Sequence, residues 1–252
     1  MPWYSINTAS MIQYLRLTDS DVKQVWLADD AAAGCEINSL HRWYNNLKIE
    51  GEKYGYFVNG GKSWLIVKSD DLAQKAKSIF GKSVNITVDG KRHLGSVIGS
   101  QSYKDQYCSD KVENWKKELV TLCEIAKSQP QAAYVAFTKG YRSKFTYFLR
   151  TIPGFEQYLA PVDDIINESF LPTLFGLDVP IEESYKQLFT LAPSDGGLGI
   201  PSLLEEAQHQ FTNSVKISQH HTNLTLEQSM ILDDLTAHTE QKNICKQENK
   251  KR

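Results

Sequence analysis

Apolar positions in the first third of the chain alternate between helical and strand spacing. Five apolar residues recur along one face of a helix expected over residues 1–17: Trp3, Ile6, Ala9, Ile12 and Leu15. The polar residues 18–21 suit a turn, and Val22 to Leu27 is a short apolar stretch that predicts a strand. Because this strand runs into Ala28-Asp29-Asp30-Ala31, the sequence predicts a β-hairpin with acidic residues at its tip.

Further helices and strands are predicted as far as Gly99. Ser39 is a typical N-cap residue and predicts a helix to about Tyr54, which Gly55 ends. Apolar spacing then predicts a strand at 64–67, a helix at 70–80 and a hairpin whose strands, 84–88 and 93–98, flank an Asp89-Gly90 turn. This part of the chain is therefore expected to mix helices and strands.

From Ser109 onward the pattern becomes helical. Apolar residues recur every three or four positions up to Pro130: Val112, Trp115, Leu119, Leu122 and Ala126. Helices are also predicted at about 131–149, at 161–170 and from Ser202, whereas residues 241–252 are polar, rich in lysine and predicted to be disordered. The sequence thus predicts an α+β fold with a mixed domain at 1–100, a helical domain at 101–176, a helical extension at 177–240 and a tail at 241–252.

The composition excludes several classes of protein. Hydrophobic residues make up 41% of the 252 residues and charged residues 23%, which is typical of a globular protein. No apolar stretch approaches the about 20 residues of a membrane-spanning helix, and the N-terminus lacks signal-peptide features. We therefore expect no membrane association and an intracellular location, in the cytoplasm or the nucleus. The four cysteines are scattered, which favours reduced thiols over disulfides or a zinc site.

The charge is unevenly distributed along the chain. The net charge of -2 argues against a protein whose whole surface binds nucleic acid. Residues 139–150, however, contain four basic residues and no acid, whereas residues 202–240 are strongly acidic. Any contact with nucleic acid is therefore expected within 139–150.

Adjacent aspartates occur four times, so their surroundings must distinguish them. The pairs at 70–71, 163–164 and 233–234 lie at or within predicted helices, where acids are usually solvated or favoured by the helix dipole. Asp29-Asp30 instead follows a strand and precedes the small residues Ala31-Ala32-Ala33-Gly34. Two carboxylates at a tight strand end suit a divalent cation that prefers oxygen ligands, and a plain polar turn is the alternative.

Four segments resemble motifs of reverse transcriptases in the order that this family has them. Val25 to Asp30 resembles the catalytic hairpin, which reads aromatic, any residue, Asp, Asp; Tyr54 to Asn59 with Lys62-Ser63 resembles the next palm motif. His93-Leu94-Gly95 is similar to the primer grip, which usually contains Leu-Gly. Gly196 to Pro201 is similar to a segment beyond the thumb of retrotransposon polymerases.

This resemblance implies a partial polymerase palm at 1–100, a thumb at 101–176 and an RNA-directed DNA polymerase activity. The family uses an RNA template, a DNA primer, dNTPs and two Mg²⁺ ions about 3.5–4 Å apart. By resemblance, Asp29 and Asp30 are the metal ligands, and Lys62 is the residue near the leaving pyrophosphate. An exposed lysine before a strand is the alternative for Lys62.

The resemblance also implies residues that contact nucleic acid. Four would belong to the primer grip: Arg92, His93, Leu94 and Gly95. Lys139, Arg142 and Lys144 alternate with aromatic residues and would follow the template–primer backbone. The alternatives are an ordinary hairpin edge for the former set, and an aromatic core face with a basic solvent face for the latter.

The chain departs from the family in three ways. Leu27 stands where the family most often has tyrosine, the fingers are absent, and no upstream strand supplies the third carboxylate, because only 28 residues precede Asp29. Of the two upstream acids, Asp19 and Asp21, the nearer lies about 26 Å away along an extended strand. We therefore expect no polymerisation by this chain alone, with the missing upstream part of the polymerase as a partner. A non-catalytic nucleic-acid-binding remnant and a remnant with no selected role are the alternatives.

Overall fold

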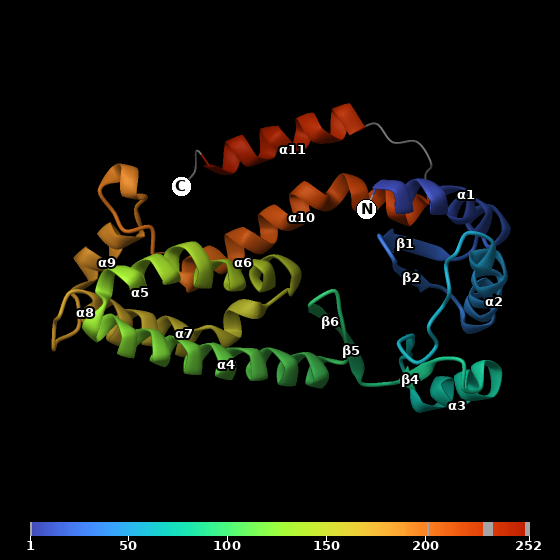
Figure 1. Cartoon of the computed structure of the whole chain (residues 1–252), viewed down its shortest axis with the longest axis horizontal. Coiled ribbons are helices and arrows are strands. Elements are labelled where there is room, and N and C mark those ends of the chain that lie inside the picture. Colours follow the sequence, from blue (N-terminus) through green and yellow to red (C-terminus); the bar gives the residue numbers. More distant parts are fainter. Residues whose placement is uncertain (1, 201, 229–233, 250–252) are drawn as a thin grey trace. The chain divides into compact units, whose positions relative to one another are not determined.

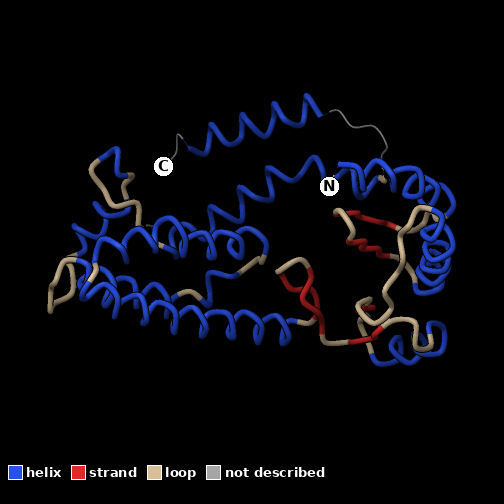
Figure 2. Tube along the Cα trace, viewed as in Figure 1, coloured by secondary structure: helices blue, strands red, loops and turns tan. Residues whose placement is uncertain are grey.

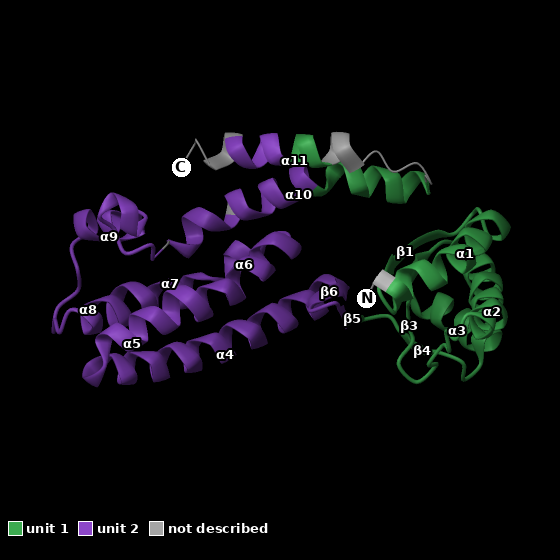
Figure 3. Cartoon of the chain, turned by 45° about the horizontal axis from the view of Figure 1, so that its top comes forward, with its two compact units in different colours: residues 1–91, 218–241 green, residues 92–217, 242–252 purple. Residues whose placement is uncertain are grey.

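The computed structural model of the chain describes residues 2–200, 202–228 and 234–249 (Figure 1). The fold is mixed α+β, as the sequence predicts, and 67% of it is helical. The described strands form two-stranded sheets (Figure 2). The chain divides into two compact units: unit 1 comprises residues 1–91 and 218–241, and unit 2 comprises residues 92–217 and 242–252 (Figure 3). This division falls at Arg92, whereas the sequence predicts a boundary at residue 100.

Unit 1 contains helices and short strands around one small core. Its elements are α1 (Pro2–Thr18), β1 (Lys23–Leu27), β2 (Asp30–Gly34), α2 (Ile37–Lys53), β3 (Trp64–Ile66), α3 (Asp70–Phe80) and β4 (Asn85–Thr87). The buried core residues come mainly from α1 and α2: Met11, Leu15, Val22, Trp43, Tyr44, Leu47 and Phe80. Helix α3 has the predicted bounds, because Ser69 caps its first turn and Gly81, at φ +57°, ends it.

Helix α1 buries a different face from the one that its apolar spacing predicts. Thr8, Met11 and Leu15 are at most 2% exposed, whereas Trp3 and Ile6 are 84% and 66% exposed. The predicted face was therefore wrong for the first half of the helix. The reason is that α1 carries apolar residues on two sides, and only packing against α2 selects between them.

Two other predictions in unit 1 need correction. Helix α2 begins at Ile37 rather than after Ser39, whose hydroxyl instead lies close enough to Asp21 to lower the pKa of that carboxyl. Strand β4 pairs in parallel with β3, Asn85 lying opposite Trp64, and so does not form the predicted hairpin around Asp89-Gly90. The hairpin lies later in the chain, between β5 (Gly90–His93) and β6 (Ser96–Gly99). Leu94 and Gly95 form its turn, with φ values of 48° and 84°, and two consecutive positive φ angles are typical of a type I′ turn.

Unit 2 contains residues 92–99 of this hairpin and the helices that come after it. They are α4 (Gln101–Ser128), α5 (Pro130–Val135), the π-helix η1 (Ala136–Tyr141), α6 (Arg142–Thr151), the 3₁₀ turn η2 (Phe155–Tyr158), α7 (Ala160–Ile165), the π-helix η3 (Ile166–Phe170), α8 (Leu171–Leu174), α9 (Glu183–Thr190) and the 3₁₀ turn η4 (Pro193–Asp195). Helix α10 (Leu203–Glu227) and helix α11 (Asp234–Asn249) complete the chain, each with residues in both units. Helix α11 extends through residues that the sequence predicts to be disordered.

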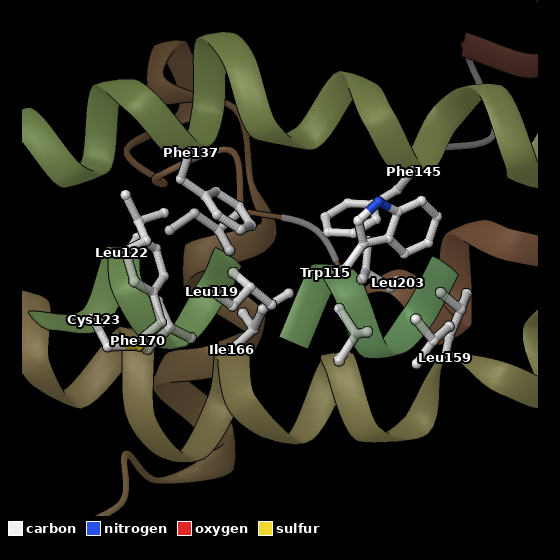
Figure 4. Packing of buried hydrophobic residues seen from close by; sticks show 14 of the residues in the cluster. Trp115, Leu119, Leu122, Cys123, Phe137, Phe145, Leu159, Ile166, Phe170 and Leu203 are labelled. Carbon is white, nitrogen blue, oxygen red and sulfur yellow. The ribbon is translucent and has the colours of Figure 1, made fainter. Parts of the chain in front are cut away.

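The core of unit 2 confirms the predicted face of α4. All five predicted positions are buried, and Trp115 lies beside Phe145 in the core (Figure 4). Its ring meets those of Phe145 and Phe148 edge-on at 5.0 Å, and that of Phe155 at 5.7 Å. The two π-helices bring Phe137 and Phe170 together at 4.9 Å, where the sequence predicts two regular helices.

Two further features concern the expected absence of membrane association and the expected reduced cysteines. Among the described helices, none has the length and apolar character required to cross a lipid bilayer. The four cysteines are free thiols, and Cys108 and Cys123 lie in the core of unit 2.

The buried carboxylate of Asp163 gives a testable pH dependence. It accepts hydrogen bonds from the Leu203 amide at 3.0 Å, at the start of α10, and from the Asn167 side chain at 2.8 Å. Burial raises the pKa of Asp163, so folding favours its protonated form. Its contribution to stability is therefore present at low pH and is lost as the pH rises through the raised pKa.

We expect the free energy of unfolding of the wild type to fall relative to that of Asp163→Asn as the pH rises from about 3 to about 7. Urea unfolding across this range measures the difference, and Asp164→Asn, at the exposed neighbour, controls for the lost charge. A difference that moves in favour of the wild type as the pH rises would contradict the assignment.

Candidate functional site

The two aspartates lie at the tip of the first hairpin. Strands β1 and β2 pair from Lys23↔Gly34 to Leu27↔Asp30, so Ala28 and Asp29 form a two-residue turn. Ala28 has a φ of 54°, in a region that L-residues rarely adopt. Asp29 and Asp30 are both exposed, so two adjacent carboxylates are open to solvent.

An aromatic layer with one buried amide supports this tip. Gln24, which is fully buried, accepts hydrogen bonds from the indole nitrogens of Trp26 at 2.9 Å and Trp43 at 3.4 Å. Trp26 also meets the ring of Tyr56 edge-on at 5.6 Å. The strand that leads to the aspartates is thus fixed to α2 and to the segment after it.

Tyr56 contacts the tip directly. Its hydroxyl donates a hydrogen bond to the Asp29 carbonyl oxygen at 3.2 Å. Burial raises the pKa of Tyr56 to about 12, and Tyr4, Asp30 and Asp29 contribute to the increase, so the phenol remains a donor near neutral pH. In the sequence, Tyr56 stands out only as part of a motif. The sequence signal for its role is its position directly after Gly55, which has a φ of 73° and follows the end of α2.

Lys62 lies in a turn that comes after Tyr56. The Asn59 side chain accepts a hydrogen bond from the Lys62 amide at 3.2 Å, and the Ser63 hydroxyl donates to the Asn59 carbonyl at 2.9 Å. Lys62 is exposed, and no ion pair in the described part of the chain joins it to Asp29 or Asp30.

The two upstream acids have structural partners. Asp19, fully buried, bonds to Arg42 Nε at 2.7 Å and to the Asn46 side chain at 2.9 Å, while Asp21 bonds to Arg42 Nη2 at 2.5 Å. Within the described residues, no group of three His, Cys, Asp or Glu side chains could hold a metal ion. Asp29 and Asp30 are oxygen donors that suit Mg²⁺, but they form only part of a ligand set.

Two of the other aspartate pairs lie in helices, as the sequence predicts. Asp70-Asp71 lies in the first turn of α3, and Asp163-Asp164 lies in α7. In the fourth pair, Asp233 lies outside the described residues.

The second predicted contact surface is the β5–β6 hairpin. Arg92 is exposed and His93 is partly buried, while Leu94 and Gly95 occupy the turn. The carbonyl oxygens of Leu94 and Gly95 accept hydrogen bonds from Tyr147 and Tyr107. These four predicted residues therefore lie together, next to α4 and α6.

The three basic residues of the predicted thumb have different environments. Arg142 is partly buried and bonds to the Gly199 carbonyl at 3.0 Å and to Glu206 at 3.1 Å, so it holds the Gly196–Gly199 loop and α10. Lys144 pairs with Glu118 at 2.7 Å on the surface, and Lys139 is exposed on η1. The neighbouring Tyr141 donates to the Trp115 carbonyl at 2.6 Å and belongs to the core side.

No protein-family model, curated protein or solved structure matches this chain. The functional interpretation therefore depends on the residues and their geometry.

Proposed function

We propose that the chain is a palm and thumb fragment of a retroelement RNA-directed DNA polymerase, which binds a primed RNA template. The observation that carries the proposal is the exposed Asp29-Asp30 pair at the tip of a two-residue hairpin. Further support comes from the order of the next elements along the chain: Gly55 follows the end of α2, the Asn59–Lys62 turn precedes β3, and Leu94-Gly95 forms a second hairpin turn.

In this proposal, Asp29 and Asp30 contribute two ligands of a two-metal site. Bound Mg²⁺ would activate the primer hydroxyl and neutralise charge on the incoming dNTP. The protein's own contribution is to hold both carboxylates at a fixed turn, with Tyr56 bonded to the Asp29 carbonyl. Because these two carboxylates are only part of a ligand set among the described residues, we expect no polymerisation by the chain alone.

The second candidate function is nucleic-acid binding without catalysis. The partial ligand set at Asp29-Asp30 favours it, together with exposed basic groups at Arg92 and Lys139. Lys144 also fits, because an exposed ion pair such as Lys144–Glu118 is weak and a phosphate can replace the carboxylate.

A terbium titration tests the metal site. Tyr56 and Trp26 lie beside the tip and can sensitise the luminescence of a bound lanthanide. We expect the double variant Asp29→Asn/Asp30→Asn to weaken terbium binding by more than about tenfold, because losing even outer partners of a metal commonly costs 10–100-fold. Asp70→Asn/Asp71→Asn is the matched control and should bind like the wild type. Equal titrations for all three proteins would reject the site.

A salt titration tests nucleic-acid binding. Affinity for a primed RNA–DNA hybrid should fall steeply with salt, because each neutralised phosphate releases counterions. Lys139→Ala/Lys144→Ala should reduce the slope of log K against log salt by about 2, whereas Lys127→Ala, in an ion pair on α4, should leave it unchanged. An affinity that does not depend on salt would exclude both candidate functions.

Primer extension separates the two candidates. The chain alone should not incorporate dNTPs, and addition of the upstream polymerase segment should restore Mg²⁺-dependent extension that Asp29→Asn abolishes. Binding without any restored extension would favour the non-catalytic function. Extension that persists in Asp29→Asn would show that the acidic pair is not the catalytic site.

A further inference from the structure

We infer that Tyr107 and Tyr147 form a clasp that fixes the β5–β6 hairpin to the helices of unit 2 and positions Arg92 for contact with a nucleic-acid backbone. The positioning role rests on the proposed function, whereas the clasp itself is a property of the fold. Tyr107 lies outside the motifs that suggested the nucleic-acid contacts, whereas Tyr147 is one of the aromatic residues that alternate with the basic residues of 139–150.

The clasp consists of two hydrogen bonds to consecutive carbonyl groups of the hairpin turn. Tyr147, on α6, donates to the Leu94 carbonyl oxygen, and Tyr107, on α4, donates to the Gly95 carbonyl oxygen at 2.8 Å. A Cβ atom at Gly95 would lie 3.3 Å from the Tyr147 ring, so the turn is also in close van der Waals contact. An isolated two-stranded hairpin is marginally stable, and these contacts therefore determine its orientation.

The two tyrosines are themselves held by the core. The ring of Tyr107 stacks on Phe148 at 6.4 Å, and the ring of Tyr147 meets Phe148 edge-on at 5.6 Å. Phe148 in turn packs against Trp115, and Val97 of β6 contacts the same core. Burial raises the pKa of Tyr107, which keeps its hydroxyl protonated and able to donate.

Two basic groups lie near Tyr107. Arg92 is exposed and lies near enough to Tyr107 to oppose part of the increase in its pKa. The Lys111 ammonium lies 5.6 Å from the centre of the Tyr107 ring. Tyr147 remains 40% exposed, so its ring is available to a ligand. Proteins that bind nucleic acids use basic groups to contact phosphates and accessible aromatic rings to stack on bases.

The division of the chain agrees with this arrangement. Residues 92–99 belong to unit 2, together with α4 and α6, although Gly90 and Lys91 of the same hairpin belong to unit 1. With both turn carbonyls bonded to these helices, Arg92 keeps one position relative to them. Arg92, Lys139 on η1 and Lys144 on α6 then act as one binding surface.

Two measurements on the full chain test the inference. Hydrogen exchange of residues 90–99 should accelerate in Tyr107→Phe/Tyr147→Phe, which keeps both rings and removes both hydroxyls. Binding of a fluorescent primed RNA–DNA hybrid should weaken about five- to tenfold in the same variant, as expected when one charged contact, that of Arg92, is lost. Arg92→Ala should weaken binding by itself but add little to the double variant, because a mispositioned guanidinium no longer contributes.

Tyr134→Phe is the matched control. Its hydroxyl also bonds to a loop carbonyl of unit 2, that of Leu198 at 2.7 Å, but it is not part of the clasp. This variant should leave the exchange of residues 90–99 and the effect of Arg92→Ala unchanged.

Three outcomes would overturn the inference, and they can be told apart. Unchanged exchange in the double phenylalanine variant would reject the clasp. Faster exchange with fully additive binding effects would reject the positioning of Arg92. A wild-type chain that binds no hybrid would reject the proposed function and the positioning role together, while the exchange result would still decide whether the clasp exists.

Discussion

Replacing Trp115 with alanine should lower the free energy of unfolding by about 3–5 kcal/mol. The indole is 5% exposed and contacts Phe145, Phe148 and Phe155, which come from two further segments of unit 2. Its removal leaves a cavity that rigid aromatic neighbours fill poorly. Urea unfolding, followed by circular dichroism, measures the effect.

The exposed side of the same helix supplies the control for Trp115. Val120 is 52% exposed on α4, so Val120→Ala should change the free energy of unfolding by no more than about 0.5 kcal/mol. Equal unfolding midpoints for Trp115→Ala and Val120→Ala would mean that α4 does not pack as described.

Replacing Gly197 with alanine should destabilise the chain by about 3 kcal/mol. A Cβ atom there would lie 2.2 Å from the Leu191 carbonyl oxygen and 2.6 Å from the Leu188 carbonyl oxygen. Both are backbone atoms, so relief requires movement of the end of α9. The loop would then lose the hydrogen bond from the Leu198 amide to the Phe189 carbonyl, at 3.2 Å.

Gly140→Ala is the control for Gly197→Ala, since a Cβ at Gly140 would meet nothing within 4 Å. We expect it to be neutral or slightly stabilising, because alanine favours helical conformations more than glycine does. Thermal unfolding of both variants measures the contrast. If Gly197→Ala were as stable as Gly140→Ala, the described path of the loop would be incorrect.

These glycines clarify a segment that the sequence alone explains only by resemblance. Gly196 and Gly199 have φ values of 85° and 63°, and Gly197 has no room for a side chain. Arg142 bonds to the Gly199 carbonyl. A local backbone requirement therefore explains the glycines, whatever the ancestry of the motif.

The sequence predicts best those elements whose signals are local. Helix α3 has a capping serine and a terminal glycine, and α4 has one apolar face, so their bounds or buried positions agree with the structure. The parallel pairing of β3 with β4 has no turn signal, because α3 lies between the strands. Periodicity alone likewise cannot select which of two apolar sides of α1 is buried.

At the candidate site, too, local signals predict positions, whereas contacts between distant residues are not predictable from the sequence. Asp29-Asp30 lies at the hairpin tip that the strand and turn pattern predicts. The roles of Arg142 and Tyr147 depend on partners 57 and 53 residues away, which no spacing argument provides. The positive φ angles of Ala28 and Leu94 were equally inaccessible, because neither residue type favours them.

Gln24 has a consequence for errors in strand alignment. If β1 slipped by one residue against its support, Gln24 and Trp26, which share one face of the strand, would both turn outward, and a neighbouring side chain of β1 would face the indole N–H group of Trp43. The Trp43 donor would then lack its acceptor, which carries a penalty because this indole is buried. One amide thus discriminates against the misaligned hairpin, in which a different pair of residues would occupy the tip.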